Sequence, residues 1–315
     1  MNCVRAPVRR GEQVVGLVHR SKTDTATRRI GGAPTARRLI TALAGAVLVA
    51  ATLIAVSAAP AGAANLKYAA IVGDAGGNGY WLVQSGGTAV PHGSAPTLSN
   101  TNCDPLFTAP VLGAVATPDH LGFWEYNAKG GIACFGDAVN WGSGDTHTLA
   151  HPIVGMSTSY DGNGYHMVDG TGGVIAWGDA CYLGSPTTVP KNKPIVAVTD
   201  YPFGSPSCAS TGYTEVGSSG TVYAFGASVS YGTPASTSRI VTIVSTPDGL
   251  GYWELARSGV VTNLGSAPSL GWTSVAASQR MVSMAITPAG DGYWELGLHG
   301  IVWPHGTAIS YGNGP

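Results

Sequence analysis

Charged residues are scarce in this chain of 315 residues, since Asp, Glu, Lys and Arg together make up only 10% of it. Helical periodicity is missing as well, because no apolar pattern with a period near 3.6 residues persists after residue 65. The sequence also lacks a nucleophile elbow, a His-Glu-x-x-His pair, a phosphate-binding loop and a dinucleotide glycine motif. These absences exclude a helical fold for most of the chain and leave no recognised catalytic motif.

Lys and Arg are concentrated at the N-terminus, where nine of the 16 precede residue 39, against two acidic residues, Glu12 and Asp24. Residues 39–56 are uncharged and rich in Ala, Leu, Val and Ile, and the small-x-small sequence Ala61-Gly62-Ala63 follows. This order predicts a secretory signal peptide with a basic arm over residues 1–64, and therefore a secreted protein. The alternative is a retained membrane anchor, because the apolar run is near spanning length.

Removal of residues 1–64 would leave seven basic and 15 acidic residues, so that the net charge would change from −1 to about −8. An acidic surface with few lysines argues against nucleic acid and anionic membranes as partners. No stable membrane span is expected after removal. Residues 65–315 form one domain in this interpretation, long enough to bury a full core.

Cysteine is rare, and once Cys3 is lost with the signal peptide four remain. An even number in an exported chain indicates disulfides, and four cysteines allow three pairings. We favour Cys103 with Cys134 and Cys181 with Cys208, because local bonds would tether two irregular insertions to neighbouring units. Free buried thiols are the alternative; a zinc site is disfavoured, since no C-x-x-C spacing exists. No metal or other cofactor is predicted.

Residues 65–315 contain a repeated unit marked by an aromatic pair. The copies align on Tyr80-Trp81, Phe123-Trp124, Tyr165-His166, Tyr213-Thr214, Tyr252-Trp253 and Tyr293-Trp294. A second marker, a glycine after an aromatic residue, His or Leu, follows at Gly93, Gly136, Gly178, Gly226, Gly265 and Gly306. Both markers advance by 43, 42, 48, 39 and 41 residues, which identifies six copies of one unit.

Each unit contains short strands separated by turn residues. In the last copy, strands are predicted at residues 281–287, 293–298, 301–304 and 307–311, where aromatic and β-branched residues are bounded by Gly, Pro and Asp. Four strands in about 40 residues are typical of a propeller blade. We therefore predict an all-β fold, a β-propeller of about six four-stranded blades. A β-solenoid or open repeat array is the alternative.

The repeated motifs resemble a known family. T-P-D-G-x-G-Y-W, then G-G-x-x-x-F-G-D-A and Y-G-S, are similar to the repeat of secreted actinobacterial proteins. Here Thr117-Pro118-Asp119 precedes Phe123-Trp124, and Phe135-Gly136-Asp137-Ala138 follows. The resemblance covers residues 66–313, although Gly-Asp-Ala is degenerate in several copies. It implies an extracellular, propeller-like module with poorly defined ligands, and supplies no catalytic residues.

Two sets of strand residues are candidate ligand contacts. Four copies carry a glutamate two residues after the first aromatic: Glu125, Glu215, Glu254 and Glu295. Such carboxylates could form a partial circle that binds a cation or sugar hydroxyls; the alternative is a half-exposed strand position, since Leu82 and Met167 replace them elsewhere. The second aromatics are Trp81, Trp124, Trp253 and Trp294. If exposed they would stack on sugar rings, whereas wedging between blades is their commoner role.

Histidines and turn aspartates offer weaker candidates. His92 and His305 occupy matching places in the first and last copies, and could offer a metal two imidazoles or simply replace an aromatic residue. We favour replacement. The turn aspartates Asp119, Asp161 and Asp248 are expected to accept hydrogen bonds from their own backbone, with calcium binding as the alternative.

The fourth copy carries an insertion over residues 201–211, which is either a binding edge or a loop without a role. Taken together, the sequence predicts a module, either released or associated with the cell wall, that is secreted and recognises an extracellular or cell-surface glycan or a protein. Two alternatives stay open: a hydrolase acting on polysaccharide or peptidoglycan, with Glu residues as acid and base, and a structural envelope protein.

Overall fold

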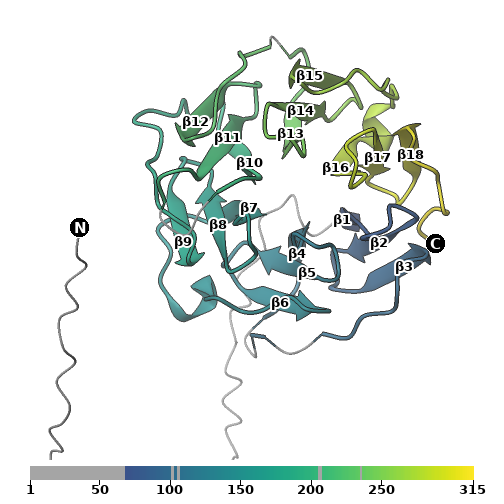
Figure 1. Ribbon diagram of the computed structural model, residues 1–315, viewed down its shortest axis with the longest axis horizontal. Coiled ribbons are helices and arrows are strands. Elements are labelled where there is room, and N and C mark those ends of the chain that lie inside the picture. Colours follow the sequence, from purple (N-terminus) through teal and green to yellow (C-terminus); the bar gives the residue numbers. More distant parts are fainter. Residues whose placement is uncertain (1–67, 101–102, 105–106, 205–207, 235) are drawn as a thin grey trace, which may run out of the picture. The chain divides into compact units, whose positions relative to one another are not determined.

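The protein is described by a computed structural model that covers residues 68–315 apart from 101–102, 105–106, 205–207 and 235. These residues contain six antiparallel sheets of three strands each, and helical structure is limited to two short 3-10 turns, η1 (Gly144–Thr146) and η2 (Ala277–Gln279). The all-β prediction is therefore confirmed. Each sheet corresponds to one copy of the repeat (Figure 1).

Within each sheet the strands follow one another in sequence order. The first strands are β1 (Tyr68–Gly73), β4 (Val111–Ala116), β7 (Ile153–Thr158), β10 (Ile195–Asp200), β13 (Ile240–Ser245) and β16 (Met281–Ile286). The second strands are β2 (Gly79–Gln84), β5 (Phe123–Asn127), β8 (Gly164–Asp169), β11 (Gly212–Gly217), β14 (Gly251–Ala256) and β17 (Gly292–Gly297). The third strands are β3 (Ala89–Gly93), β6 (Ile132–Phe135), β9 (Val174–Gly178), β12 (Val222–Gly226), β15 (Val261–Gly265) and β18 (Val302–Gly306).

The second and third strands of all six sheets share one register at the first aromatic residue. Tyr80 lies opposite His92 across β2 and β3, and Tyr293 lies opposite His305 across β17 and β18. Every first strand also shows the same register shift after its first residue. The two sequence markers keep one spacing because the first aromatic residue of each copy faces the residue before the glycine marker across the same strand pair.

The predicted fourth strand is wrong in the last copy, where residues 307–311 follow β18 without joining its sheet. Side chains bind the backbone of this segment instead. Trp294 Nε1 donates to the Ile309 carbonyl at 2.8 Å, and the Tyr80 hydroxyl accepts from Tyr311 N at 3.0 Å. Because these groups already have partners, the segment needs no ladder of hydrogen bonds.

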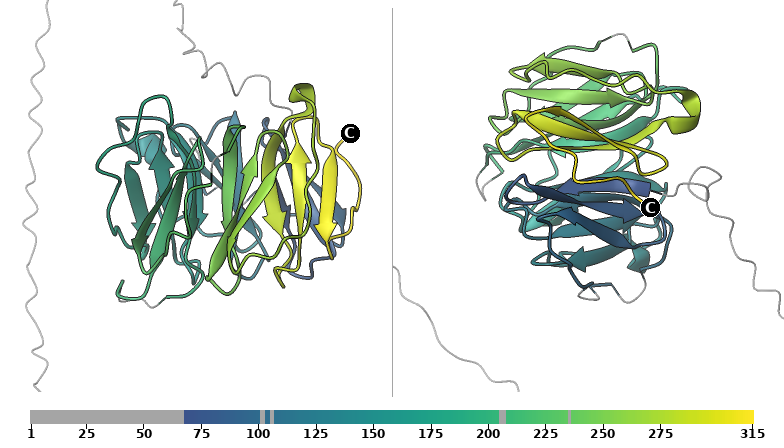
Figure 2. Two further views of the ribbon diagram at one scale, coloured as in Figure 1. Left: turned by 90° about the horizontal axis from the view of Figure 1, so that it is seen from above. Right: turned by 90° about the vertical axis from the view of Figure 1, so that its right-hand side faces the viewer.

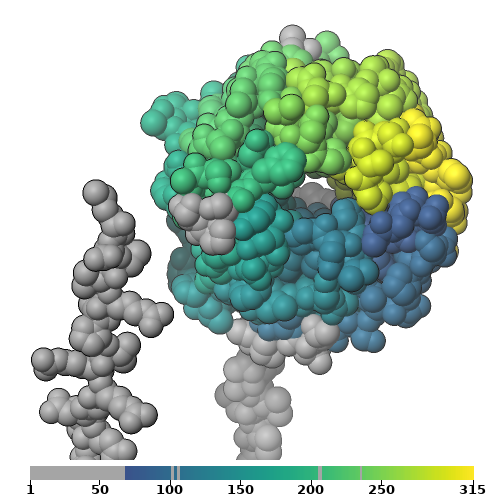
Figure 3. Space-filling model, viewed as in Figure 1, coloured from purple at the N-terminus to yellow at the C-terminus, as the bar shows by residue number. Residues whose placement is uncertain are grey.

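The first strands of successive sheets lie side by side, and β1 contacts both β4 and β16. They line a cavity of about 250 Å³. Figure 1 shows the sheets around this central space, and the space-filling view shows its opening (Figure 3). Seen from the side, the strands run from the turns at one end of the central space to the turns at the other end (Figure 2).

Where the first aromatic residue of a sheet is tyrosine, its hydroxyl joins that sheet to the preceding one. The Tyr213 hydroxyl accepts from Leu183 N at 3.2 Å and donates to Gly184 O at 2.5 Å, both in the segment after the previous sheet. The Tyr80 hydroxyl makes the equivalent bonds to Tyr311 and Gly312, so that the first sheet holds the C-terminal segment of the last.

A Tyr80→Phe variant is expected to lose about 2 kcal/mol of unfolding free energy, because it removes two part-buried hydrogen bonds, to the Tyr311 N–H and to the Gly312 carbonyl. Thermal unfolding should occur about 4–8 °C lower. Tyr182→Phe is the matched control, since Tyr182 is 61% exposed and should tolerate loss of its hydroxyl. Equal melting temperatures for the two variants would contradict this role of Tyr80.

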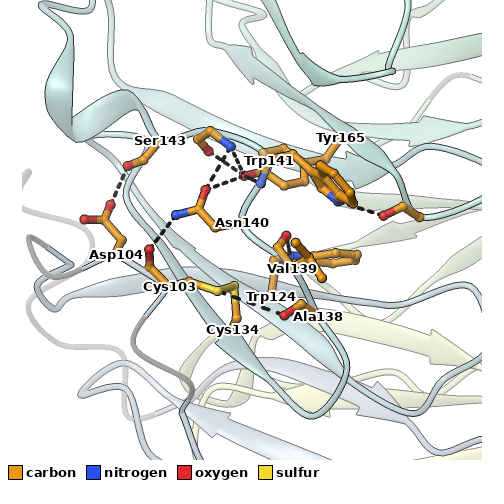
Figure 4. Close-up of a disulfide and its surroundings, with 12 residues drawn as sticks. Cys103, Asp104, Trp124, Cys134, Ala138, Val139, Asn140, Trp141, Ser143 and Tyr165 are labelled. Atoms are coloured by element: carbon orange, nitrogen blue, oxygen red, sulfur yellow. Dashed lines mark hydrogen bonds between the residues drawn. A yellow bond between two sulfur atoms is a disulfide. The ribbon is translucent and has the colours of Figure 1, made fainter.

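Both expected disulfides are present, Cys103–Cys134 and Cys181–Cys208, with Cα atoms 5.5 and 5.6 Å apart. The first joins the segment after the first sheet to β6, at the junction where Phe123 has no hydroxyl to donate. Asn140 Nδ2 donates to the Cys103 carbonyl at 2.7 Å and strengthens the same junction (Figure 4). The local pairing is therefore confirmed.

The predicted signal peptide, residues 1–64, lies outside the described residues. Within residues 68–315, apart from the gaps given above, no helix has the length and apolar character needed to cross a membrane.

Candidate functional site

The four glutamates lie inside the protein and are 0% exposed, so the expectation of a half-exposed strand position is wrong. Each lies two residues after the first aromatic residue of a second strand, which lies between two strands of its own sheet and packs against the next sheet. The carboxyl groups approach glycine turns of the preceding sheet: a Cβ added at Gly172 would lie 3.2 Å from Glu215 Oε2, and one at Gly220 would lie 3.1 Å from Glu254 Oε2.

Burial raises the pKa of Glu125 to about 7 and those of Glu215 and Glu254 to about 8. Among the described residues, the oxygens of these three side chains find no hydrogen-bond partner. Glu295 differs, because His305 Nε2 lies 3.3 Å from its Oε2 and opposes the increase in its pKa that burial causes. Below pH 7 the first three carboxyl groups are mostly neutral, and a neutral carboxyl group has little attraction for a cation.

Trp81, Trp124, Trp253 and Trp294 are at most 1% exposed. Each indole N–H donates to a carbonyl 15 residues downstream, for example from Trp81 to Pro96 at 2.7 Å and from Trp253 to Pro268 at 3.0 Å. Their faces pack between sheets, with Trp253 edge-on to Tyr293. The structure therefore supports the wedging role, and contacts of these tryptophans and of the glutamates with a ligand stay a prediction.

His92 and His305 pack separately on Tyr80 and Tyr293, with ring centroids 5.4 and 5.2 Å apart, as replacements for an aromatic residue. In the part of the chain that the structure describes, no group of three His, Cys, Asp or Glu side chains could hold a metal ion.

The turn aspartates accept bonds from their own backbone, as Asp119 does from Leu121 N at 3.1 Å and Asp248 from Leu250 N at 3.0 Å. The Asx-turn interpretation is confirmed.

The best candidate site is a second cavity, of about 390 Å³, at the C-terminal ends of the first strands. Turns of several sheets meet there, and proline occupies the same turn position at Pro118, Pro202, Pro247 and Pro288. Among the described residues that line it, Asp200 and His120 are the only ionisable side chains apart from tyrosines. A cavity of this size and character suits a small uncharged ligand.

Two tyrosines give this cavity its aromatic surface. Tyr160 replaces the turn proline of the third copy, and Tyr201 begins the insertion of the fourth. Neither phenol hydroxyl has a hydrogen bond to another described residue. The insertion packs between turns, since a Cβ at Gly204 would lie 2.8 Å from Tyr160 and one at Gly249 2.6 Å from Tyr201. The insertion thus contributes to this cavity.

His120 also lines the cavity, and the analysis of the sequence missed it. Its φ of 58° lies in the left-handed region, where the equivalent residues are glycines: Gly77, Gly162, Gly249 and Gly290. Such strain costs on the order of 1 kcal/mol and is often retained at functional sites. The sequence does contain a sign of this residue: residues 117–120 read T-P-D-H, where the equivalent turn at residues 246–249 reads T-P-D-G.

The ring of His120 has a defined orientation. Nδ1 lies 3.0 Å from the Gly73 carbonyl, and because a carbonyl can only accept, Nδ1 carries a proton. In the neutral ring Nε2 is then an acceptor, with no bond to any other described residue, and it can accept a hydrogen bond from a ligand hydroxyl.

Comparison with protein-family models and with curated proteins finds no match to this chain.

Proposed function

We propose that the protein is an exported, closed six-bladed β-propeller of the actinobacterial repeat type that binds an uncharged glycan without turning it over. In this proposal each blade has three strands and an extended fourth segment that bonds to the next blade. Closure is supported by the position of β1 between β4 and β16, and by the bonds from Tyr80 to residues 311 and 312. Residues 1–64 act as the export signal, and the two disulfides suit an oxidising compartment.

The observation that carries the ligand class is a pair of tyrosines, Tyr160 and Tyr201, whose hydroxyls have no hydrogen bond to another described residue and which line a cavity of about 390 Å³. Sugar rings present apolar C–H faces that stack on aromatic rings, and hydroxyls that bond to phenol and imidazole groups. Asp200 does not make the cavity anionic, because His166 lies 2.8 Å from its carboxylate. A saccharide fits this surface better than a charged polymer or a flat protein face does.

Glycan-array screening followed by calorimetry tests the proposal. Tyr160→Ala and Tyr201→Ala should each weaken binding at least about tenfold, through loss of stacking and of one hydroxyl contact. Tyr182→Ala is the matched control, because Tyr182 is 61% exposed and lies outside the cavity, so its loss should leave affinity unchanged. Equal affinity in all three variants would refute this site.

The absence of turnover has its own test, since a hydrolase with Glu254 and Glu295 as acid and base is the main alternative. Both carboxyl groups are 0% exposed, so a bound chain would not reach them. Incubation with polysaccharide or peptidoglycan should release no reducing ends. Release that disappears in Glu254→Gln and in Glu295→Gln, each tested alone, would replace the binding proposal with hydrolysis.

A further inference from the structure

His166 occupies the place of the tryptophan in the third copy and makes the same hydrogen bond. Its Nε2 lies 2.9 Å from the Cys181 carbonyl, 15 residues downstream, as each indole N–H does in its own sheet. Because a carbonyl can only accept, this nitrogen carries a proton. His166 is 3% exposed, so water does not compete for the bond.

The other ring nitrogen, Nδ1, lies 2.8 Å from Asp200 Oδ1. The distance between these two atoms is that of an ion pair, although the N–H bond of the ring does not point directly at the carboxylate oxygen. Two lone pairs would repel at this separation, so one proton lies between the ring and the carboxylate, and the ring holds it because imidazolium is a weaker acid than a carboxyl group. The ring therefore needs protons on both nitrogens to keep both contacts, and tryptophan could make only the first.

These two contacts hold the two ends of the inserted segment. Asp200 is the last residue of β10 and directly precedes Tyr201. Cys181, whose carbonyl accepts the other bond, is joined by its disulfide to Cys208 at the far end of the insertion. One buried imidazole thus connects the start of the segment with the anchor of its end.

We propose that His166 is a positioning residue: in its doubly protonated form it ties Asp200 to Cys181 and so places Tyr201 at the cavity, and loss of a proton weakens ligand binding. This inference rests on the proposed glycan site. It adds a dependence on pH that a site made only of aromatic residues would not have.

The groups around the ring determine the direction of the effect. Asp200 on β10 favours the charged ring, and the Cys181 carbonyl bonds to it. Glu215 on β11 also faces the ring, but it favours the charged form only where its own buried carboxyl group is ionised. Tyr213 on β11 packs on the ring with centroids 4.5 Å apart. Burial lowers the pKa of His166, but these partners outweigh it and raise the pKa above its ordinary value. The stabilising contribution is thus present at low pH and disappears as pH rises through that raised pKa.

The first test variant is Asp200→Asn, which keeps the shape of the Asp200 side chain and removes its charge. The Asn amide can donate a hydrogen bond to Nδ1 of a neutral His166 ring, so the contact no longer requires a doubly protonated ring. A second variant, His166→Trp, restores the residue of the other copies and keeps the bond to Cys181. Both should fold, and neither should show the fall in ligand affinity between pH 6 and pH 9. In the unmodified protein, affinity should fall about tenfold across this range.

A second measurement is amide hydrogen exchange in the ligand-free protein, followed in peptides that cover residues 200–212. After correction for intrinsic rates, exchange there should be faster at pH 9 than at pH 6 in the unmodified protein only. An equal pH response in Asp200→Asn, or no response in the unmodified protein, would overturn the role of His166. If exchange responds as expected but no glycan binds at any pH, the proposed function fails and the positioning of the segment stands.

Discussion

A Glu254→Gln variant is expected to unfold at a higher temperature than the unmodified protein at pH 8, and at about the same temperature at pH 4. Glu254 is 0% exposed and its oxygens have no hydrogen-bond partner among the described residues, so its charged form is poorly tolerated. Gln has nearly the same shape and never ionises. The variant should therefore keep the packing while removing the cost of a buried charge.

The sign follows from proton linkage. Burial raises the pKa of Glu254 from 4.5 in the unfolded chain to about 8 in the folded protein. Between these values the folded state keeps a proton that the unfolded state has lost, so stability falls as pH rises from about 4.5 to 8. The difference corresponds to about 3–5 kcal/mol at pH 8, or about 10 °C in melting temperature for a domain of this size.

Glu295→Gln serves as the matched control, because His305 already lies 3.3 Å from its carboxyl group and the variant would remove that contact. Its gain at pH 8 should be clearly smaller. Melting temperatures across pH 4 to 8, measured by calorimetry, compare both variants with the unmodified protein. An unchanged or lower melting temperature for Glu254→Gln at pH 8 would show that the carboxyl group is stabilised by contacts that this structure lacks.

A Trp253→Ala variant should lose about 3–5 kcal/mol of unfolding free energy, because it leaves a large cavity between two sheets. Trp253 is 0% exposed, packs edge-on to Tyr293, and donates to the Pro268 carbonyl at 3.0 Å. Denaturant unfolding should therefore have a much lower midpoint than in the unmodified protein.

Trp272→Ala provides the comparison, since Trp272 is 51% exposed and its removal should change stability by less than about 0.5 kcal/mol. The pair separates the two roles considered for the repeated tryptophans. A stacking platform for sugars would lose affinity and keep its stability on replacement by Ala, whereas a wedge between sheets loses stability. Normal stability of Trp253→Ala would contradict the wedge.

The strands and turns of each unit were predictable because their signals are local. In the last copy, strands expected at residues 281–287 and 293–298 correspond to β16 (Met281–Ile286) and β17 (Gly292–Gly297). Alternating apolar residues and turns rich in Gly and Pro are sufficient to specify such hairpins. The disulfide pairs were also predictable, because each bond joins two neighbouring units and its cysteines are only 31 or 27 residues apart in sequence.

The fourth strand and the exposure of the glutamates were predicted wrongly because both depend on the adjacent sheet. The segment after β18 bonds to the Tyr80 hydroxyl, from the opposite end of the chain. Glu215 is covered by a glycine turn of the sheet before its own. No pattern within one copy of the repeat contains these contacts.

The sequence by itself determined that one β unit recurs six times, since strand and turn chemistry acts between residues only a few positions apart. Only the tertiary structure decided which residues face a cavity. The repeated Glu and Trp residues are buried between sheets. His120, Tyr160 and Tyr201, from three different copies of the repeat, line one cavity. The physical reason is that burial is a property of neighbouring sheets, and those neighbours come from distant parts of the chain.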